Sequence, residues 1–331
     1  MIPGCSQTPK LAEEPTETTT EAEIIPEVME IGQSYTVNDK ANIIISKIQT
    51  VEYTSPLLGL GSTTYFKITG KIIVDVVLTI ENLSNEEAAA NELIKITAMD
   101  LETSTEYEPN KYEAEINNYN DLSTEEKIKP GEQGRVHCNL QVPENNHSYK
   151  IYIGEDKEFE IEYQSGTLAA NYEILEKDVK IECENFSDIT LKDVYYTPSI
   201  EPPNPTSIYN YAKAKEENNT LLVAKFEITN HTGEEKELQD LLNVSTYSAS
   251  EDFLMVQFQA IAEKSDGSNL VISLSGLSSP TIGAEETLTV YYANEVNTTL
   301  QEEDVDLFIA MKGKEYIYTQ NAASAAEDTA E

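Results

Sequence analysis

The sequence predicts an all-β protein that contains two tandem β-sandwich domains. Apolar side chains alternate with polar ones in short runs, as at Val136, Cys138 and Leu140, and this period of two marks half-buried strands. Turn residues separate many such runs and long helical periodicity is scarce, a combination typical of β-sandwiches. The second half of the chain also repeats the first in outline, so we expect one sandwich to have been copied.

Four segments recur in the same order along the chain. Residues 44–56, 74–87, 128–142 and 150–164 are matched by residues 188–199, 221–235, 281–296 and 306–320. The alignment pairs Asn82 with Asn230. It also pairs Gly131 with Gly283. We expect each asparagine to end a strand and to shape a turn by bonding its own backbone, and we expect Pro130 and Gly131 to form the corner of a type II turn.

The composition of the two chain ends sets the predicted domain limits. Residues 1–27 hold a cysteine and a stretch rich in Thr, Glu and Pro, with too little apolar surface to fold, so we expect a disordered tether there. Residues 28–165 and 166–320 are the two predicted sandwiches, which agrees with the usual size of about 100–200 residues per domain. Residues 321–331 are expected to form a disordered acidic tail.

The run Ile2-Pro3-Gly4-Cys5 resembles the lipobox of bacterial lipoproteins, in which signal peptidase cleaves before the cysteine and the sulfur carries diacylglycerol. Pro3 departs from the pattern at a permissive position. The charged and apolar regions of a signal peptide are missing, so we expect a trimmed chain or a start at an internal methionine. The resemblance implies a protein that is lipid-anchored through Cys5 on the outer face of the cytoplasmic membrane. A stray cysteine in a disordered end is the alternative.

A second resemblance rests on residues 31–39, 80–82, 96–109 and 129–132. In these stretches the chain resembles the immunoglobulin-like extracellular domains of Gram-positive bacterial lipoproteins, a family related in fold to the immunoprotective extracellular antigen. The similarity extends over residues 28–163 and, more weakly, over residues 170–320. It implies an immunoglobulin-like sandwich of about seven to nine strands in each copy, a surface location and a non-enzymatic role. It carries over no active-site residue.

The charge of the chain limits its partners. There are 60 acidic and 22 basic residues, which gives a formal net charge of -38. A field of this sign repels phosphate backbones, so we expect no nucleic-acid partner. No apolar run reaches the ~18 residues of a membrane span. We therefore expect contact with the membrane only through the lipid on Cys5.

Patterns for catalysis and for metal binding are scarce. His137 and Cys138 are neighbours in the sequence, but neighbours on a strand point to opposite faces, so they cannot form a nucleophile and base pair. Zinc-protease, serine-hydrolase and phosphate-loop motifs are missing, and we expect neither enzymatic activity nor a cofactor. The densest acidic run, residues 302–306, does not guarantee the about six to eight converging oxygens that Ca²⁺ needs. We interpret it as a solvated edge and predict no metal site.

The two remaining cysteines fall in different predicted domains. Cys138 and Cys183 both lie on strand faces that are expected to point inward. Because each domain closes its own core, we expect two free buried thiols, with a disulfide as the alternative.

The candidate partner-binding residues lie on two loops at equivalent places in the two copies. They are Leu57, Leu58, Leu60 and Tyr65 in residues 55–66, and Ile208, Tyr209 and Tyr211 in residues 195–213. Binding residues concentrate on loops that a rigid scaffold holds, and tyrosine provides a large contact area at low entropic cost. The alternative is that both loops fold back and cap their own cores.

Two functions from different classes fit these observations. The first is a binding or adhesion module for an unknown protein or peptide, and it predicts that Leu57 and Tyr209 are exposed in one apolar patch. The second is a structural or accessory envelope subunit, or a spacer, and it predicts buried loops and a large interdomain contact near residues 164–170. No oligomeric state is predicted.

Overall fold

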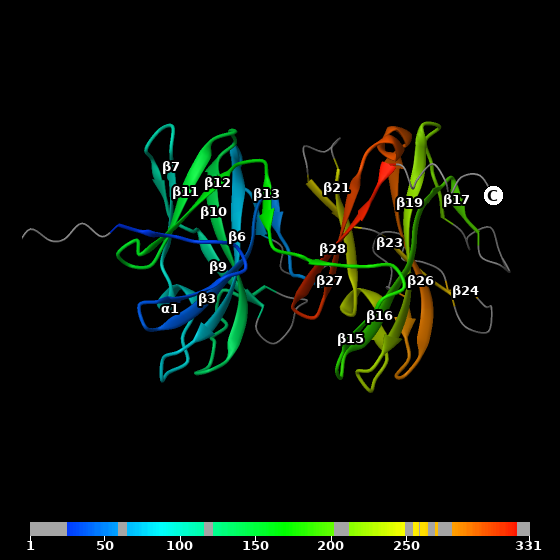
Figure 1. The fold of residues 1–331 in the computed structure, drawn as a ribbon, viewed down its shortest axis with the longest axis horizontal. Coiled ribbons are helices and arrows are strands. Elements are labelled where there is room, and N and C mark those ends of the chain that lie inside the picture. Colours follow the sequence, from blue (N-terminus) through cyan, green and yellow to red (C-terminus); the bar gives the residue numbers. More distant parts are fainter. Residues whose placement is uncertain are drawn as a thin grey trace, which may run out of the picture.

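The computed structural model describes residues 25–58, 65–115, 122–201, 212–248, 254–257, 259–263, 269–270 and 280–322. Almost all regular structure in these ranges is β-strand, arranged as two β-sandwiches that follow one another along the long axis of the molecule (Figure 1). Within the described ranges, no helix is long and apolar enough to cross a membrane. The predicted all-β fold class is confirmed.

Two sheets form the first sandwich. The five-stranded sheet has the order β1 (Glu27–Val28), β12 (Phe159–Gln164), β11 (Ser148–Ile153), β7 (Ile96–Asp100), β8 (Glu106–Tyr107). The six-stranded sheet has the order β13 (Leu168–Ala170), β3 (Ala41–Val51), β6 (Lys71–Asn82), β10 (Gln133–Pro143), β9 (Lys111–Glu115), and β2 (Ser34–Val37) also pairs with β3. The short helix α1 (Ala90–Leu93) and the hairpin of β4 (Tyr53–Thr54) and β5 (Tyr65–Phe66) complete this domain.

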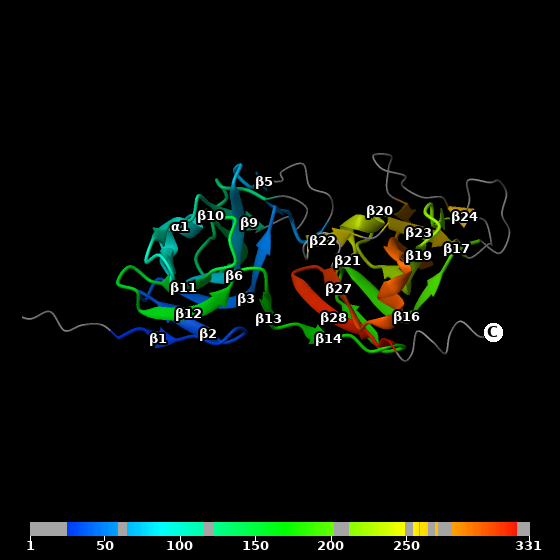
Figure 2. The same cartoon turned by 90° about the horizontal axis from the view of Figure 1, so that it is seen from above.

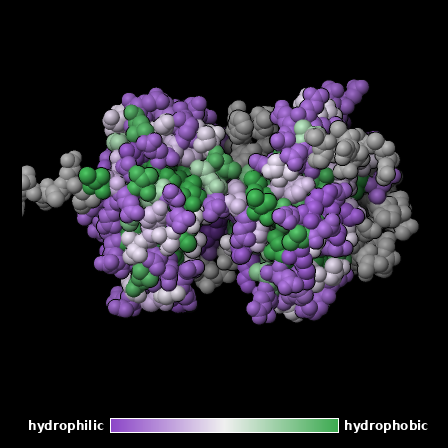
Figure 3. All heavy atoms as spheres, viewed as in Figure 1, coloured by the Kyte–Doolittle hydropathy of each residue, from purple (hydrophilic) through white to green (hydrophobic). Residues whose placement is uncertain are grey.

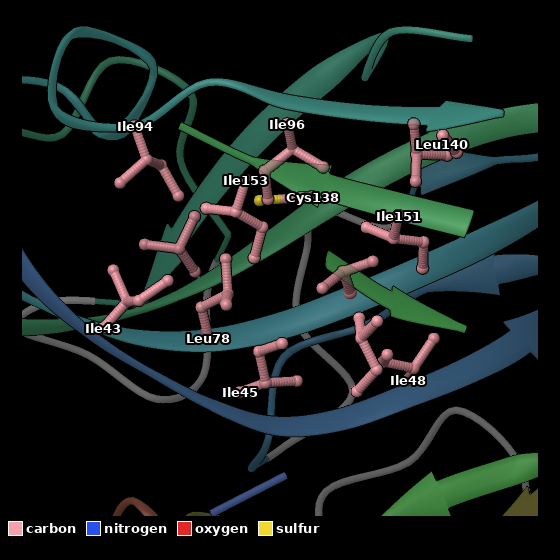
Figure 4. Close-up of a cluster of buried hydrophobic side chains, with 14 of the residues drawn as sticks. Ile43, Ile45, Ile48, Leu78, Ile94, Ile96, Cys138, Leu140, Ile151 and Ile153 are labelled. Carbon is pink, nitrogen blue, oxygen red and sulfur yellow. The ribbon is translucent and has the colours of Figure 1, made fainter. Parts of the chain in front are cut away.

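The first core lies between these two sheets. Alternation along β3 sends Ile43 and Ile45 inward, where they are fully buried. In Figure 4 they lie on the side of the core opposite Ile151 and Ile153 of β11. Each buried isoleucine contributes about 1.5–3 kcal/mol relative to an exposed one.

The second sandwich repeats this plan. Its five-stranded sheet has the order β14 (Glu173–Ile174), β28 (Lys314–Gln320), β27 (Val305–Met311), β21 (Asn243–Ser248), β22 (Leu254–Gln257). Its six-stranded sheet has the order β15 (Lys180–Cys183), β16 (Ser187–Thr197), β19 (Asn219–Asn230), β26 (Thr287–Asn297), β23 (Gln259–Glu263), β24 (Asn269–Leu270). Two small pairs, β17 (Ser199–Ile200) with β18 (Ala212–Lys213) and β20 (Lys236–Glu237) with β25 (Thr281–Ile282), and the 3-10 helices η1 (Leu238–Asp240) and η3 (Thr298–Glu302) join these strands.

The paired segments of the sequence repeat lie in corresponding strands, as predicted. β3, β6 and β10 occupy the same adjacent places in one sheet as β16, β19 and β26 in the other. β1 and β14 each add a short parallel edge to the smaller sheet. Even a register irregularity is repeated, between Ile45 and Lys47 in β3 and between Leu191 and Asp193 in β16. The two sandwiches therefore share one strand plan.

The two paired asparagines have the predicted structural role. The Nδ2 of Asn82 donates to the backbone carbonyls of Glu86 and Ile128, both at 2.8 Å, and its Oδ1 accepts from the backbone N–H of Ser84 at 2.8 Å. Asn230 makes the same set of bonds to the carbonyls of Glu234 and Ile282 and to the N–H of Thr232. Both asparagines are fully buried, so each ties the end of a central strand to the following turn.

The predicted pairing of Gly131 with Gly283 is wrong by two residues. Gly131 sits at φ 73° in the expected turn, closed by a bond of 3.0 Å from the N–H of Glu132 to the carbonyl of Lys129. In the second sandwich the residue at this place is Glu285, with φ 56°, and its N–H bonds to Asn230 as that of Gly131 bonds to Asn82. The second turn has no glycine at its left-handed position, and the sequence match therefore fell on the nearest glycine.

Of the two remaining cysteines, only Cys138 is fully buried, although both are free. Cys138 points into the first core (Figure 4), and burial raises the pKa of its thiol well above the usual value. Cys183 lies on the edge strand β15 and is only partly buried against the second core, so the expectation of two fully buried thiols is wrong for it. An edge strand has no neighbour to cover it on one side.

The segment between the sandwiches is held against the first one. β13 pairs with Gln49, Ile48 and Lys47 of β3, and it lies between the two domains in both ribbon views (Figures 1 and 2). Two further bonds fasten its ends, from the N–H of Gly166 to Oγ1 of Thr50 at 2.9 Å and from the N–H of Asn171 to the carbonyl of Ser46 at 3.2 Å. These hydrogen bonds make residues up to Ala170 part of the first sandwich. The limit predicted from the sequence is residue 165.

Replacing either buried asparagine is expected to destabilise the protein. Asn82→Ala and Asn230→Ala each remove the buried amide that joins a strand end to the backbone of the following turn through several hydrogen bonds, and this loss is expected to cost about 1–3 kcal/mol. Urea unfolding followed by tyrosine fluorescence measures this loss, with Asn85→Ala, at an exposed position in the same turn as Asn82, as the matched control. Variants that stay within about 0.5 kcal/mol of the unaltered protein would contradict the role given to these side chains.

Candidate functional site at the domain junction

The outward face of the first six-stranded sheet carries charged side chains that are buried. Lys47, Asp75, Arg135 and His137 come from the three central strands, on the side that points away from the first core. Each is at most 8% exposed. Burying charge is costly unless it is paired, so the partners of these groups define the site.

A chain of ion pairs joins these groups to the second sandwich. His137 lies between two carboxylates, with Nδ1 2.9 Å from Oδ2 of Asp75 and Nε2 3.0 Å from Oε1 of Glu115. Nη2 of Arg135 donates to Oε2 of Glu315 at 3.0 Å. Lys47 donates to the other oxygen of Glu315 at 2.6 Å. Glu315 belongs to β28, so its single carboxylate bridges two cations of the first sandwich across the junction.

Mutual attraction keeps these groups ionised. Burial opposes the charge of Glu315, but the attraction of Lys47 and then Arg135 outweighs it and lowers the pKa of Glu315 to about 2. Burial also opposes the charge of His137, yet Asp75 and Glu115 raise its pKa to about 9. At neutral pH the imidazole is therefore a cation held between two carboxylates. With both ring nitrogens taken by carboxylates, it is not available as a base.

A fourth carboxyl group lies beside this network. Glu113 accepts a hydrogen bond of 2.7 Å from Oγ1 of Thr54, and its Oε1 lacks a hydrogen-bond partner among the described residues. Burial raises the pKa of Glu113 to about 7, even though that hydrogen bond and His137 act in the opposite direction. The group is therefore half-protonated near neutral pH.

The second sandwich has neither the arginine nor the histidine at the equivalent positions, and Asp193 stands at the place of Lys47. The strand register places Val223 where the first copy has Asp75, and Tyr195 where it has Gln49. Tyr291 likewise takes the place of His137. Here the outward face is an apolar cluster built around Val223 and Ile261. The fold does not need a charged outward face, and the first copy has one where it meets the second.

An apolar contact lies next to the ion pairs. Leu57 is 6% exposed and Leu58 is 2% exposed, and both pack with Ala310 and the partly buried Phe186 of the second sandwich. The N–H of Leu57 donates to Oε1 of Glu115 at 2.9 Å, which connects this contact to the charged network. These two leucines were predicted to bind a partner. They instead form part of the contact between the two domains.

Of the other predicted partner-binding residues, the structure describes Tyr65. Tyr65 is half-buried, with Nζ of Lys111 3.3 Å from the centre of its ring. Leu60, Ile208, Tyr209, Tyr211 and the predicted lipid-carrying Cys5 lie outside the described residues. On the hairpin of β4 and β5, Tyr53 and Phe66 are 39% and 70% exposed, with ring centroids 5.8 Å apart.

A cleft of about 150 Å³ opens between the sandwiches beside the ion pairs. Its charged end is formed by Lys47, Arg135 and Glu315, and Tyr53 and Phe308 contribute aromatic rings to its walls. Among the described residues, no group of three or more His, Cys, Asp or Glu side chains could hold a metal ion. On the face drawn in Figure 3, hydrophobic residues gather on both sides of the junction, and hydrophilic ones cover most of the rest.

Comparisons with known proteins bear on the fold alone. Neither protein-family models nor curated proteins give a match to this chain. Among solved structures, the chain is similar to the crystal structure of an uncharacterized β-sandwich protein from Clostridium difficile 630. The two chains are 19% identical, the match covers 44% of this chain and 97% of the other, and the TM-score is 0.38.

The stability of the protein is expected to fall in two steps as the pH rises from about 4.5. Glu113 has a folded pKa of about 7 against an ordinary 4.5, and His137 has about 9 against 6.5. Groups with a raised pKa stabilise the fold below their ordinary value and lose that contribution as the pH passes the folded value. The His137 step is about 3 kcal/mol. Towards acid, the contribution of Glu315 is lost below pH 4.5 as the pH approaches about 2.

Free energies of unfolding measured between pH 3 and pH 10 test this profile. His137→Gln should remove the step between about pH 6.5 and 9, and the Glu113 step should persist and extend to higher pH, because the imidazolium no longer lowers the pKa of Glu113. A wild-type profile that is flat above pH 6.5, or one that rises there, would contradict the paired state of His137.

Proposed function

We propose that the protein is a lipid-anchored surface protein whose two immunoglobulin-like sandwiches act together as a rigid, non-catalytic spacer or accessory subunit of the cell envelope. The observation that carries this proposal is the bridge from Glu315 to Lys47 and Arg135. The three side chains of this bridge, which spans the junction, are only 5–14% exposed. If the two domains moved independently, these charges would be exposed to water and the buried ion pairs would not form. The pairs therefore require the domains to stay in contact.

Three separate contacts limit rotation between the sandwiches. The ion pairs of Glu315 form one, and the leucines packed on Ala310 form another. The third is β13, which is paired with β3 directly before the chain enters the second sandwich at β14. Contacts at different points of one interface fix the angle between the two sandwiches as well as the distance between them. A rigid spacer requires both to be fixed.

The place of the chain ends suits a protein held at its N-terminus. β1 lies in the first sandwich, and the second sandwich is at the other end of the long axis (Figure 1). A diacylglycerol on Cys5, followed by the predicted tether, would keep the first sandwich near the membrane and place the second one farther out. The lipobox-like run Ile2-Pro3-Gly4-Cys5 supports this anchoring.

A binding module is the second candidate function. It is favoured by Phe66, which is 70% exposed, and by its neighbours Tyr53 and Ile68, which are 39% and 48% exposed. Exposed aromatic side chains are enriched at sites of protein contact. The first candidate is preferred because Leu57 and Leu58, the residues that a binding loop was expected to expose, are used for the domain contact.

A rigid spacer should show one narrow distance between its sandwiches. Nitroxide labels on Asn85→Cys and Glu235→Cys, with Cys5 and Cys183 replaced by serine, report this distance by pulsed electron paramagnetic resonance. We expect Glu315→Ala to broaden the distribution, because it leaves two buried cations without their counter-ion. Glu173→Ala, at a surface pair with 63% exposure, is the matched control and should leave the distribution narrow. A distribution that is broad before any substitution would contradict the spacer.

The anchor has a separate test. Mass spectrometry of the N-terminal peptide, taken from protein isolated from its native membrane, should show a diacylglycerol on the sulfur of Cys5. An unmodified thiol there would refute the anchoring and would leave the rigidity of the junction untouched.

A further inference from the structure

The cleft at the junction has properties of a ligand site that the spacer proposal does not use. It holds about 150 Å³, well above the ~10–15 Å³ that a cavity needs to hold one water molecule. Small-molecule sites occur preferentially at domain interfaces. The volume is below the ~300–1,000 Å³ of pockets for drug-sized ligands, so it fits one small ring.

Hydrogen-bond donors and acceptors alternate at the charged end of the cleft. A guanidinium carries five N–H donors, and among the described residues Arg135 uses one of them, from Nη2 to Glu315. Lys47 likewise donates one hydrogen bond, to the other oxygen of Glu315. Each oxygen of Glu315 can accept a further bond. A ligand group that both donates and accepts, such as a hydroxyl, matches this arrangement.

The charges at this end cancel, which disfavours a charged ligand. The cations of Lys47, Arg135 and His137 face the carboxylates of Asp75, Glu115 and Glu315. The carboxylate of Glu52 also lines the cleft and is paired with Lys67. An anion would also be repelled by the chain as a whole, whose formal charge is -38. A cation would meet the three basic groups that line the cleft, Lys47, Arg135 and His137. The lining carboxylates of Glu52 and Glu315 are each already paired with a basic side chain.

The remaining walls are apolar or aromatic. Val51, Leu57 and Ala310 line the cleft together with the rings of Tyr53 and Phe308. Phe308 is 5% exposed and Leu57 is 6% exposed, so these walls are fixed by packing. Tyr53 also lines the cleft and is 39% exposed, so part of its side chain is open to solvent. Such rings can pack against the apolar C–H face of a cyclic ligand.

From these features we infer that the cleft is a binding site for one neutral saccharide unit. Its hydroxyl groups would bond to Arg135, Lys47 and Glu315, and its C–H face would lie on Tyr53. In the second sandwich Asp193 stands at the place of Lys47 and Thr289 at the place of Arg135. Among the described residues this pair of basic groups is therefore found once, and the site is expected once.

Saturation-transfer difference NMR on the full chain tests this inference. The probes are methyl glucoside, methyl galactoside and N-acetylglucosamine at about 10 mM, because a small site of this kind is expected to have a Kd near the millimolar range. Acetate and N-acetylalanine methylamide serve as an anion probe and a peptide probe. At least one saccharide should show transfer and should bind better than either comparison probe.

Two variants tie the signal to the cleft. Tyr53→Ala removes an exposed wall and should raise the saccharide Kd about tenfold. Tyr152→Ala changes a partly exposed tyrosine on the other sheet of the first sandwich and should leave the Kd unchanged. Equal unfolding midpoints of the two variants show that both are folded. Transfer to no saccharide, stronger binding of acetate or of the peptide probe, or a signal that survives Tyr53→Ala would each overturn the inference.

Discussion

The placement of one carboxylate between two buried cations governs the arrangement of this molecule. Glu315 belongs to the second sandwich, and its carboxylate pairs with Lys47 and Arg135 on the outward face of the first. Arg135 is the only arginine in the chain. Its planar group reaches towards Glu115 on one side and bonds to Glu315 on the other, which the compact ammonium of a lysine does less well. Removing any member would strand a charge away from water, so the pairs specify how the domains meet.

The two copies show how one strand plan supports different surfaces. Both keep the irregular register in their first long strand, β3 or β16, and both bury an asparagine at the end of a central strand. They differ on the face that points away from the core, which is charged around Asp75 and apolar around Val223. Because side chains on a strand alternate between faces, this outer face can change while the inner face continues to form the core. The duplication therefore kept the core and left the junction free to specialise.

The sequence predicts the inner faces better than the outer ones. Alternating apolar residues identify the strands, and the repeated asparagines identify equivalent places in the two copies. The glycine alignment failed because Glu285 adopts the left-handed conformation that Gly131 has in the first copy. The charged site was missed because Arg135 and His137 alternate with core residues and look like the solvated side of a strand. The apolar run at Leu57 correctly marked a contact surface, yet the surface that it meets is the second sandwich of the same chain. The sequence feature that could have identified the charged site is Arg135, the single arginine in a strongly acidic chain.

The account as a whole requires Arg135 and Glu315 to be coupled across the junction, and a double-mutant cycle measures that coupling. Unfolding free energies of Arg135→Met, Glu315→Gln and the combined variant give the coupling energy of the pair after the single effects are subtracted. The structure predicts at least about 1.5 kcal/mol, the lower end of values for close, desolvated charge pairs. Additive effects, with a coupling energy near zero, would mean that the two sandwiches do not meet through these charges.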